Sequence, residues 1–190
     1  MNIEETLIKR IRVTDVENLD PVTIMLEDFE PGKGKIVIEC WGRSWSSFWP
    51  AMGGRTISEF FTSCNDDYLI RNFAPQTKTH EPDFEQFNKE IKQKICEMRR
   101  DSRGWEFIGG GLSKDLARRL YDIESWEDYI TENPYDPILC PSGIDSDEFE
   151  GLDFCDFDVP EKLSTEYLYM QLIVRTVKAA LSSTKHQQAA

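Results

Sequence analysis

The residues with the clearest chemical potential are the carboxylates between positions 120 and 161. This segment contains fourteen Asp and Glu and no Lys or Arg. Carboxylates ordered on a folded scaffold can imitate a track of phosphates and attract a basic surface. The residues predicted to bind such a partner are Asp145, Asp147, Glu148, Glu150, Asp153, Asp156 and Asp158.

Apolar side chains are interleaved with these acids. The stretch 144–161 reads IDSDEFEGLDFCDFDVPE and includes Phe149, Phe154 and Phe157. A solvated acidic tail contains few aromatics. We therefore expect the apolar side chains to be anchored in a core while the carboxylates face outward. The competing explanation is that the acids only keep the protein soluble.

The same acids could bind a cation, but their spacing does not match a known loop. An EF-hand loop that begins at Asp145 requires Gly at its sixth position and Glu at its twelfth, and Glu150 and Asp156 stand there instead. An irregular site built from Asp153, Asp156 and Asp158 is an open alternative. We expect no metal and no cofactor.

Nucleophilic catalysis has little support. His80 and His186 are the only histidines, and no feature of the sequence orients Cys64 toward His80 as a thiolate–imidazole pair requires. The glycines at 109–111 precede Ser113 without the spacing of a phosphate-binding loop. The five cysteines have no CxxC or His partner, which argues against zinc and predicts small buried hydrophobic residues: Cys40, Cys64, Cys96, Cys140 and Cys155.

The formal charge of −13 is concentrated in one segment. Residues 1–119 carry −2, residues 162–190 carry +3, and residues 120–161 carry −14. Phosphate affinity requires clustered cations, so direct binding of nucleic acid or a membrane is not expected. A weak nucleic-acid binder remains an alternative because of one basic set: Lys92, Arg99, Arg100, Arg103, Arg118 and Arg119.

Several elements are predicted to position these residues. Strands over 7–13, 22–29 and 35–41, with a turn at 30–34, predict an antiparallel hairpin or small sheet. The aromatics that follow are expected to pack in the core or at a corner, with a protein-contact surface or base stacking as alternatives: Trp41, Trp45, Phe48 and Trp49, beside Arg43 and Arg55.

Four helices are expected to cover the sheet. Two begin with capping boxes, at Thr56–Glu59 and at Asp83–Gln86, and run to about residues 64 and 100. A third starts at Ser113 and continues through Ile123. The last, over 163–181, keeps apolar residues at steps of three and four, and the tail from about 183 is expected to fray. Strands first and helices later predict an α+β fold, in a single domain over residues 1–190.

The run from Asp15 to Phe73 (DVENLDPVTIMLEDFEPGKGKIVIECWGRSWSSFWPAMGGRTISEFFTSCNDDYLIRNF) resembles small accessory proteins of tailed phages and prophages of enteric bacteria. The resemblance covers about the first 40% of the chain and brings no assigned activity or site residue. It implies a protein made in the cytoplasm of a bacterial host. Such accessory proteins often inhibit or modify host machinery, and some are acidic mimics of DNA.

The sequence thus favours a non-enzymatic phage accessory protein. Its acidic surface is predicted to bind a basic surface on a host or phage protein, such as a nucleic-acid-binding host factor that it would inhibit as a DNA mimic. The first alternative is a metal-dependent enzyme that processes nucleotides or nucleic acid. The second is the weak nucleic-acid binder. The sequence does not predict an oligomeric state.

Overall fold

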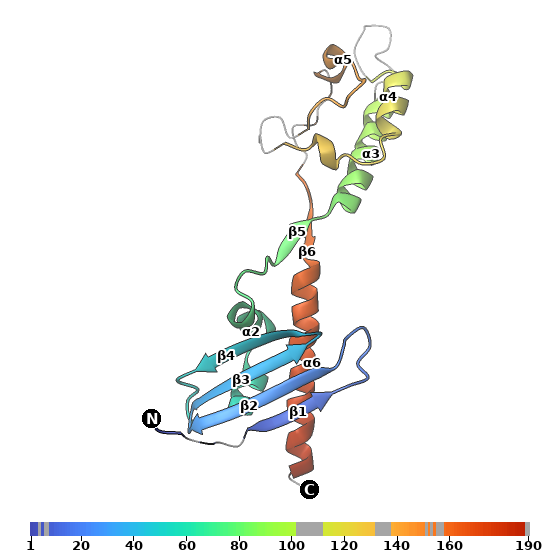
Figure 1. Ribbon diagram of the computed structural model, residues 1–190. Coiled ribbons are helices and arrows are strands. Elements are labelled where there is room, and N and C mark those ends of the chain that lie inside the picture. Colours follow the sequence, from blue (N-terminus) through green and yellow to red (C-terminus); the bar gives the residue numbers. More distant parts are fainter. Residues whose placement is uncertain are drawn as a thin grey trace. The chain divides into compact units, whose positions relative to one another are not determined.

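The computed structural model shows an α+β protein, as predicted, with a four-stranded antiparallel sheet and a long C-terminal helix (Figure 1). It describes residues 1–3, 5, 8–101, 112–131, 138–150, 152, 154 and 158–188, without the side chains of 150 and 185–188. Within these residues, no helix is both long enough and apolar enough to cross a membrane.

The chain forms two compact units, which we name the sheet unit and the acidic unit. The sheet unit combines Met1–Thr79 with Leu163–Ala190, and the acidic unit is His80–Lys162. Their hydrophobic cores share no residue among the described positions. The expectation of one domain over 1–190 stays a prediction.

The sheet of the sheet unit contains β1 (Lys9–Val13), β2 (Val22–Glu30), β3 (Lys33–Cys40) and β4 (Arg43–Trp49), in that order. The predicted hairpin is confirmed, with Ile24 of β2 opposite Ile38 of β3. Its turn is shorter than expected, because Lys33 already pairs with Glu30. Gly32 is required there: its φ is +82°, and an added Cβ would lie 2.8 Å from the backbone nitrogen of Gly54.

The aromatic segment after the hairpin forms the fourth strand, which the sequence analysis did not predict. Because side chains alternate along β4, the aromatics separate. Trp49 is buried and Trp45 is half-buried against the core, as expected. The expectation of core packing is wrong for Trp41 and Phe48, which are 74% and 48% exposed. Trp41 lies in the two-residue turn before β4, and Phe48 points to the outer face and contacts Phe29.

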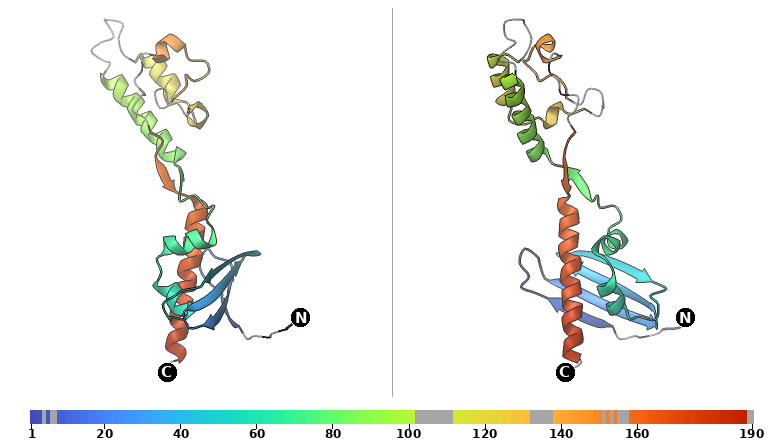
Figure 2. Two further views of the ribbon diagram at one scale, coloured as in Figure 1. Left: turned by 90° about the vertical axis from the view of Figure 1, so that its left-hand side faces the viewer. Right: turned by 180° about the vertical axis from the view of Figure 1, so that it is seen from behind.

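Three helices belong to the sheet unit: α1 (Ile57–Ser63), α2 (Asp66–Phe73) and α6 (Thr165–Gln188). Figure 2 shows α6 lying across one face of the sheet. The capping box at Thr56 is confirmed, whereas α2 was not predicted. Helix α6 starts two residues later than expected, after its cap Ser164, and it continues to Gln188 through the tail expected to fray.

The core of the sheet unit lies between the sheet and these helices. The buried side chains of α6 are Tyr167, Met170, Ile173, Val174, Val177 and Leu181. Polar contacts also join α2 to α6. The Asp66 carboxylate accepts hydrogen bonds from Lys178 at 2.7 Å and from Arg175 at 2.9 Å.

The acidic unit contains β5 (His80–Pro82), α3 (Phe84–Asp101), α4 (Lys114–Tyr121), the 3₁₀ helix η3 (Glu127–Tyr129) and α5 (Ser146–Glu150). Strand β6 (Glu161–Leu163), which pairs with β5, begins in this unit. The buried apolar residues of the acidic unit are Phe87, Ile91, Ile95, Leu112, Leu116, Ala117, Leu120, Trp126, Ile138, Phe149 and Phe154.

The predicted caps of α3 and α4 are present. Asp83 accepts a hydrogen bond from the Gln86 amide at 3.1 Å, and Ser113 accepts one from the Leu116 amide at 3.1 Å. The second half of the box at Asp83 is absent in the described structure, because the Gln86 side chain bonds Glu90 instead.

The cysteines differ in exposure more than the sequence analysis expected. Cys40 is buried, and its sulfur lies 3.4 Å from the Tyr169 hydroxyl. Cys64 and Cys140 are half-buried. The expectation is wrong for Cys96, which is exposed because the apolar stripe of α3 runs through its neighbour Ile95. Cys155 lies outside the described residues.

Candidate partner-binding surface

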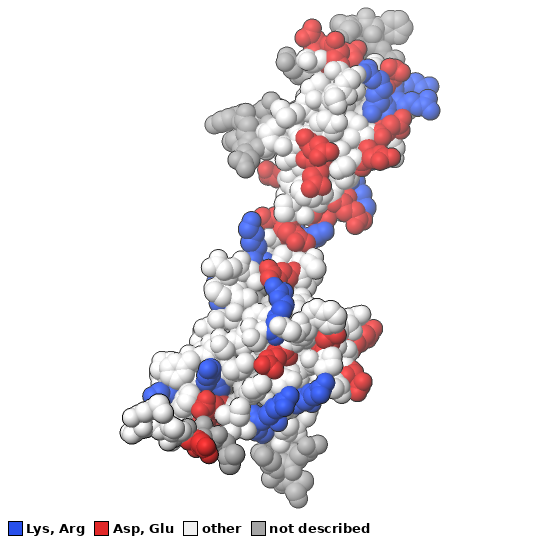
Figure 3. All heavy atoms as spheres, viewed as in Figure 1, with Lys and Arg blue, Asp and Glu red and all other residues white. Residues whose placement is uncertain are grey.

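The negative charge belongs almost entirely to the acidic unit. Residues 80–162 include 22 acidic and 10 basic side chains, a formal charge of −12, and the sheet unit carries −1. Figure 3 shows acidic side chains spread over the visible face of the acidic unit. A surface of one sign attracts an oppositely charged partner over about 10 Å at moderate salt.

Helix α5 presents the first group of predicted partner-binding residues. Asp145 caps the helix: its Oδ1 accepts hydrogen bonds from the amides of Asp147 at 3.0 Å and Glu148 at 3.4 Å. All three side chains are exposed. Glu148 lies 3.9 Å from Arg119, and because both side chains are largely exposed, solvent screens this pair.

The remaining predicted residues are only partly described. Asp158 is exposed. Glu150 ends α5, and its side chain is outside the description. Asp153 and Asp156 lie outside the described residues, as does the alternative cation site that includes them. The structure therefore brings together Asp145, Asp147 and Glu148.

Buried aromatics anchor the acidic segment, as its sequence pattern predicts. Phe149 and Phe154 stack with ring centroids 5.4 Å apart and planes inclined by 23°. Phe154 also lies 6.2 Å from Trp126, which is fully buried and whose backbone amide bonds the Asn88 side chain at 2.9 Å. These contacts fix the backbone that carries the neighbouring acids.

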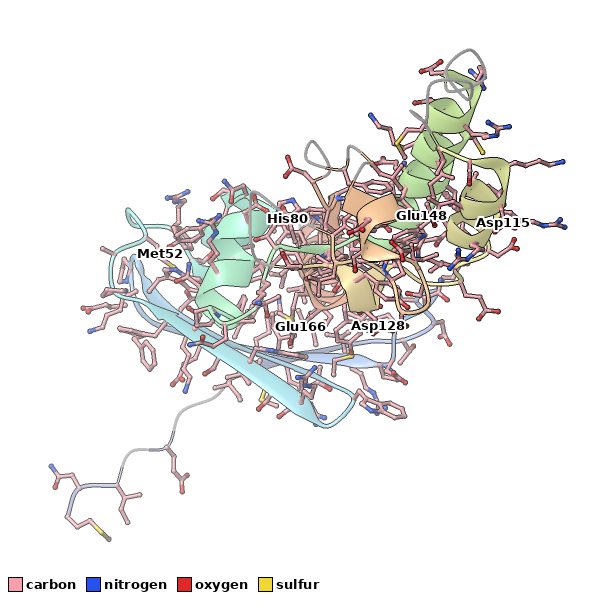
Figure 4. The ribbon with its side chains drawn as sticks, turned by 90° about the horizontal axis from the view of Figure 1, so that it is seen from above. Met52, His80, Asp115, Asp128, Glu148 and Glu166 are labelled. Atoms are coloured by element: carbon pink, nitrogen blue, oxygen red, sulfur yellow. The ribbon has the colours of Figure 1, made fainter. Side chains whose placement is uncertain are left out.

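Every described acid of the segment 120–161 is exposed. These nine acids include five that the sequence analysis did not single out, two of them on η3: Asp122, Glu124, Glu127, Asp128, Asp145, Asp147, Glu148, Asp158 and Glu161. Figure 4 labels Asp128 on η3 and Glu148 on α5. The pattern of acids around the buried Trp126 is the signal that could have identified four of these five, Asp122, Glu124, Glu127 and Asp128.

Other predicted chemistry finds less support in the described part of the chain. No group of three or more His, Cys, Asp or Glu side chains there could hold a metal ion. His80 lies at the start of β5, and the side chain of His186 is outside the description. The glycines at 109–111 also lie outside the described residues.

Together, the fold and this surface define an acidic α+β protein with a nearly neutral sheet unit and a strongly negative second unit. The chain belongs to a phage protein family, whose family model matches residues 1–183. No curated protein and no solved structure matches it. The phage origin implied by the resemblance of residues 15–73 is thereby confirmed, and the restriction to enteric hosts stays a prediction.

Proposed function

We propose that this phage protein is a non-enzymatic binding protein. Its acidic unit binds a basic surface on a host or phage protein, in the cytoplasm of the bacterial host. The observation that carries the proposal is the exposure of all nine described acids of the segment 120–161 above a core of buried aromatics.

The anchoring matters because an ordered charged surface binds at a lower entropic cost than a flexible tail. Helix α5 and η3 both border the cluster formed by Trp126, Phe149 and Phe154. The carboxylates are therefore presented before a partner arrives, as a mimic of an ordered phosphate track requires.

The surface is also poorly neutralised from within. Of the nine described acids, Glu148 alone forms an ion pair with another described residue. A carboxylate without an internal ion pair has no such pair to break when a cation of the partner approaches. Exposed carboxylates also accelerate association with a basic partner at low salt. A nucleic-acid-binding host factor has a basic surface that could bind these acids. We propose more specifically that the protein inhibits such a factor by occupying that basic surface.

The test neutralises four acids that support no described contact: Glu124→Gln, Glu127→Gln, Asp128→Asn and Asp147→Asn. The matched control removes the same charges from the sheet unit, with Glu5→Gln, Asp15→Asn, Glu17→Gln and Asp20→Asn. Each tagged protein captures partners from bacterial host lysate across a salt series, and the captured proteins are quantified by mass spectrometry.

We expect the wild type and the control to retain the same basic proteins, with capture falling as salt rises. The variant in the acidic unit should lose them. Equal capture by all three proteins, with the same salt dependence, would show that these acids serve solubility only.

A further inference from the structure

A cleft in the acidic unit has the opposite charge from its surroundings. It lies between α3 and α4, which run antiparallel: Arg99 bonds the Leu112 carbonyl at 3.3 Å, and Lys92 lies 5.4 Å from the ring of Tyr121. Its volume is about 500 Å³. This is within the range of small-molecule sites, roughly 300–1,000 Å³.

The lining of the cleft combines an apolar floor with a cationic rim. Ile95 and Ala117 are buried and form the floor. Arg99, Arg100 and Arg118 line the rim, with Asp122 as the acid among the lining residues. Neither Arg100 nor Arg118 forms an ion pair with any described residue. Figure 3 shows basic side chains gathered on the side of this unit that α4 forms.

This charge arrangement indicates an anionic ligand. The guanidinium groups of Arg100 and Arg118 line one cleft and repel one another, although the unit has 22 acids with which it could have paired these two. Arginine's planar fork binds phosphate oxygens through two parallel hydrogen bonds. A phosphate at the rim would relieve the repulsion.

The apolar floor and the aromatic wall indicate the rest of the ligand. Tyr121 is 47% exposed at the cleft, and Lys92 is stacked against its ring. A planar base can pack on such a ring and over the Ile95–Ala117 floor. A bare phosphate would leave both unused. A long polyanion would be repelled by the −12 charge of the unit, which favours a ligand with few phosphates.

We infer that the α3–α4 cleft binds a mononucleotide, with its phosphates on Arg100 and Arg118 and its base against Tyr121. The exposed thiol of Cys96 lines the same cleft and provides a reporter. A bound nucleotide shields this thiol, whereas the half-buried Cys64 of the sheet unit is an internal reference.

The experiment measures the alkylation rate of each cysteine in the full-length chain with iodoacetamide, read by peptide mass spectrometry. ADP, pyrophosphate and a short single-stranded oligonucleotide are titrated separately. At ADP tenfold above its Kd, we expect alkylation of Cys96 to slow by about tenfold, and that of Cys64 to stay constant.

Two paired variants test the rim. Arg100→Gln with Arg118→Gln should raise the ADP Kd by about tenfold or more, because two charged donors are lost. The matched control, Lys94→Gln with Lys114→Gln, removes the same charge from the same helices outside the cleft, and it should change the Kd by about twofold or less. Far-UV circular dichroism checks that both variants are folded.

Three results would overturn the inference. The first is no shielding of Cys96 by ADP. The second is equal shielding by pyrophosphate or stronger shielding by the oligonucleotide, which would assign the cleft to a bare phosphate or to nucleic acid. The third is an unchanged ADP Kd in the Arg100→Gln, Arg118→Gln variant.

Discussion

Trp41 occupies a backbone conformation that its side chain disfavours. It forms a two-residue turn with Gly42 between paired Cys40 and Arg43, and both turn residues have positive φ, +50° and +70°. Such turns favour Asn-Gly, because a bulky residue at positive φ is strained. The side chain gains little in return, since it is 74% exposed.

The change Trp41→Asn should therefore stabilise the protein. We expect the free energy of unfolding, measured by urea denaturation, to rise by about 0.5–1 kcal/mol. Trp45→Asn is the control, and it should destabilise because Trp45 packs against the core of the sheet unit. A loss of stability in Trp41→Asn would mean that the exposed ring contributes packing that outweighs the strain of the turn.

Asp66 makes the stability of the sheet unit dependent on pH. Partial burial raises the pKa of its carboxyl, but the hydrogen bonds and charges of Lys178 and Arg175 together lower that pKa below its ordinary value of 3.8. The folded chain therefore binds this proton less readily than the unfolded chain. The resulting stabilisation is fully present above the ordinary pKa and is lost as the pH falls through the lowered one.

The change Asp66→Asn should lower the free energy of unfolding at pH 7 by about 1–2 kcal/mol, because the pair with Lys178 is partly buried. The difference from the wild type should shrink as the pH falls below the ordinary pKa of 3.8. Denaturation at a series of pH values measures it. The control Glu85→Gln, which removes the exposed partner of Lys89, should leave the free energy of unfolding unchanged. An effect of Asp66→Asn that does not depend on pH would contradict the ion-pair explanation.

At the scale of single residues, the sequence predicted the solvent exposure of side chains better than it predicted the contacts between them. The alternation of acids and aromatics around Phe149 correctly indicated anchored rings and outward carboxylates. The pairing of Asp66 with Lys178 could not be predicted, because it joins positions far apart in the chain through tertiary packing. The grouping of Arg100 with Arg118 depends in the same way on how α3 and α4 cross.

Among the elements, those with strong local signals were predicted and those without were not. The hairpin has a Pro-Gly turn and regular alternation, and α3 and α4 have polar caps. Strand β4 was missed because serines separate its inward Trp45 and Trp49, so the apolar alternation is weak. Helix α2 has only eight residues, too few for a clear helical period, although Asn65 caps it.

Helix α6 depends on Ser164 at its start. The hydroxyl accepts a hydrogen bond from the Tyr167 amide at 3.1 Å and donates one to the carbonyl of Lys78. Ser164 is buried, so water cannot replace either bond.

We therefore expect Ser164→Ala to lower the free energy of unfolding by about 1–3 kcal/mol. Ser183→Ala is the matched control, because this exposed hydroxyl bonds only the carbonyl of Ala179 one turn earlier, among described residues. It should be nearly neutral in urea denaturation. Equal effects of the two changes would argue against a capping role for Ser164.

For the molecule as a whole, counting charges along the chain located the acidic segment, but it did not identify the two units. The reason is topological. Residues 163–190 leave the acidic unit and return to the sheet formed by residues 9–49, and no local pattern encodes that return. Long-range packing of α6 determines it, with Ile173 and Val177 fully buried in the same core as Ile24 and Ile38.

This arrangement predicts that the sheet unit folds without the acidic unit. Its core draws described residues only from 11–74 and 167–181. The Ser164 amide bonds the Thr79 carbonyl at 3.0 Å, so a short Gly-Ser linker can replace residues 80–162. We expect cooperative urea unfolding and a retained near-UV circular dichroism signal. Val174→Asp in the shortened chain should abolish both, because it buries a charge in the core. A shortened chain without cooperative unfolding would instead support one domain over residues 1–190.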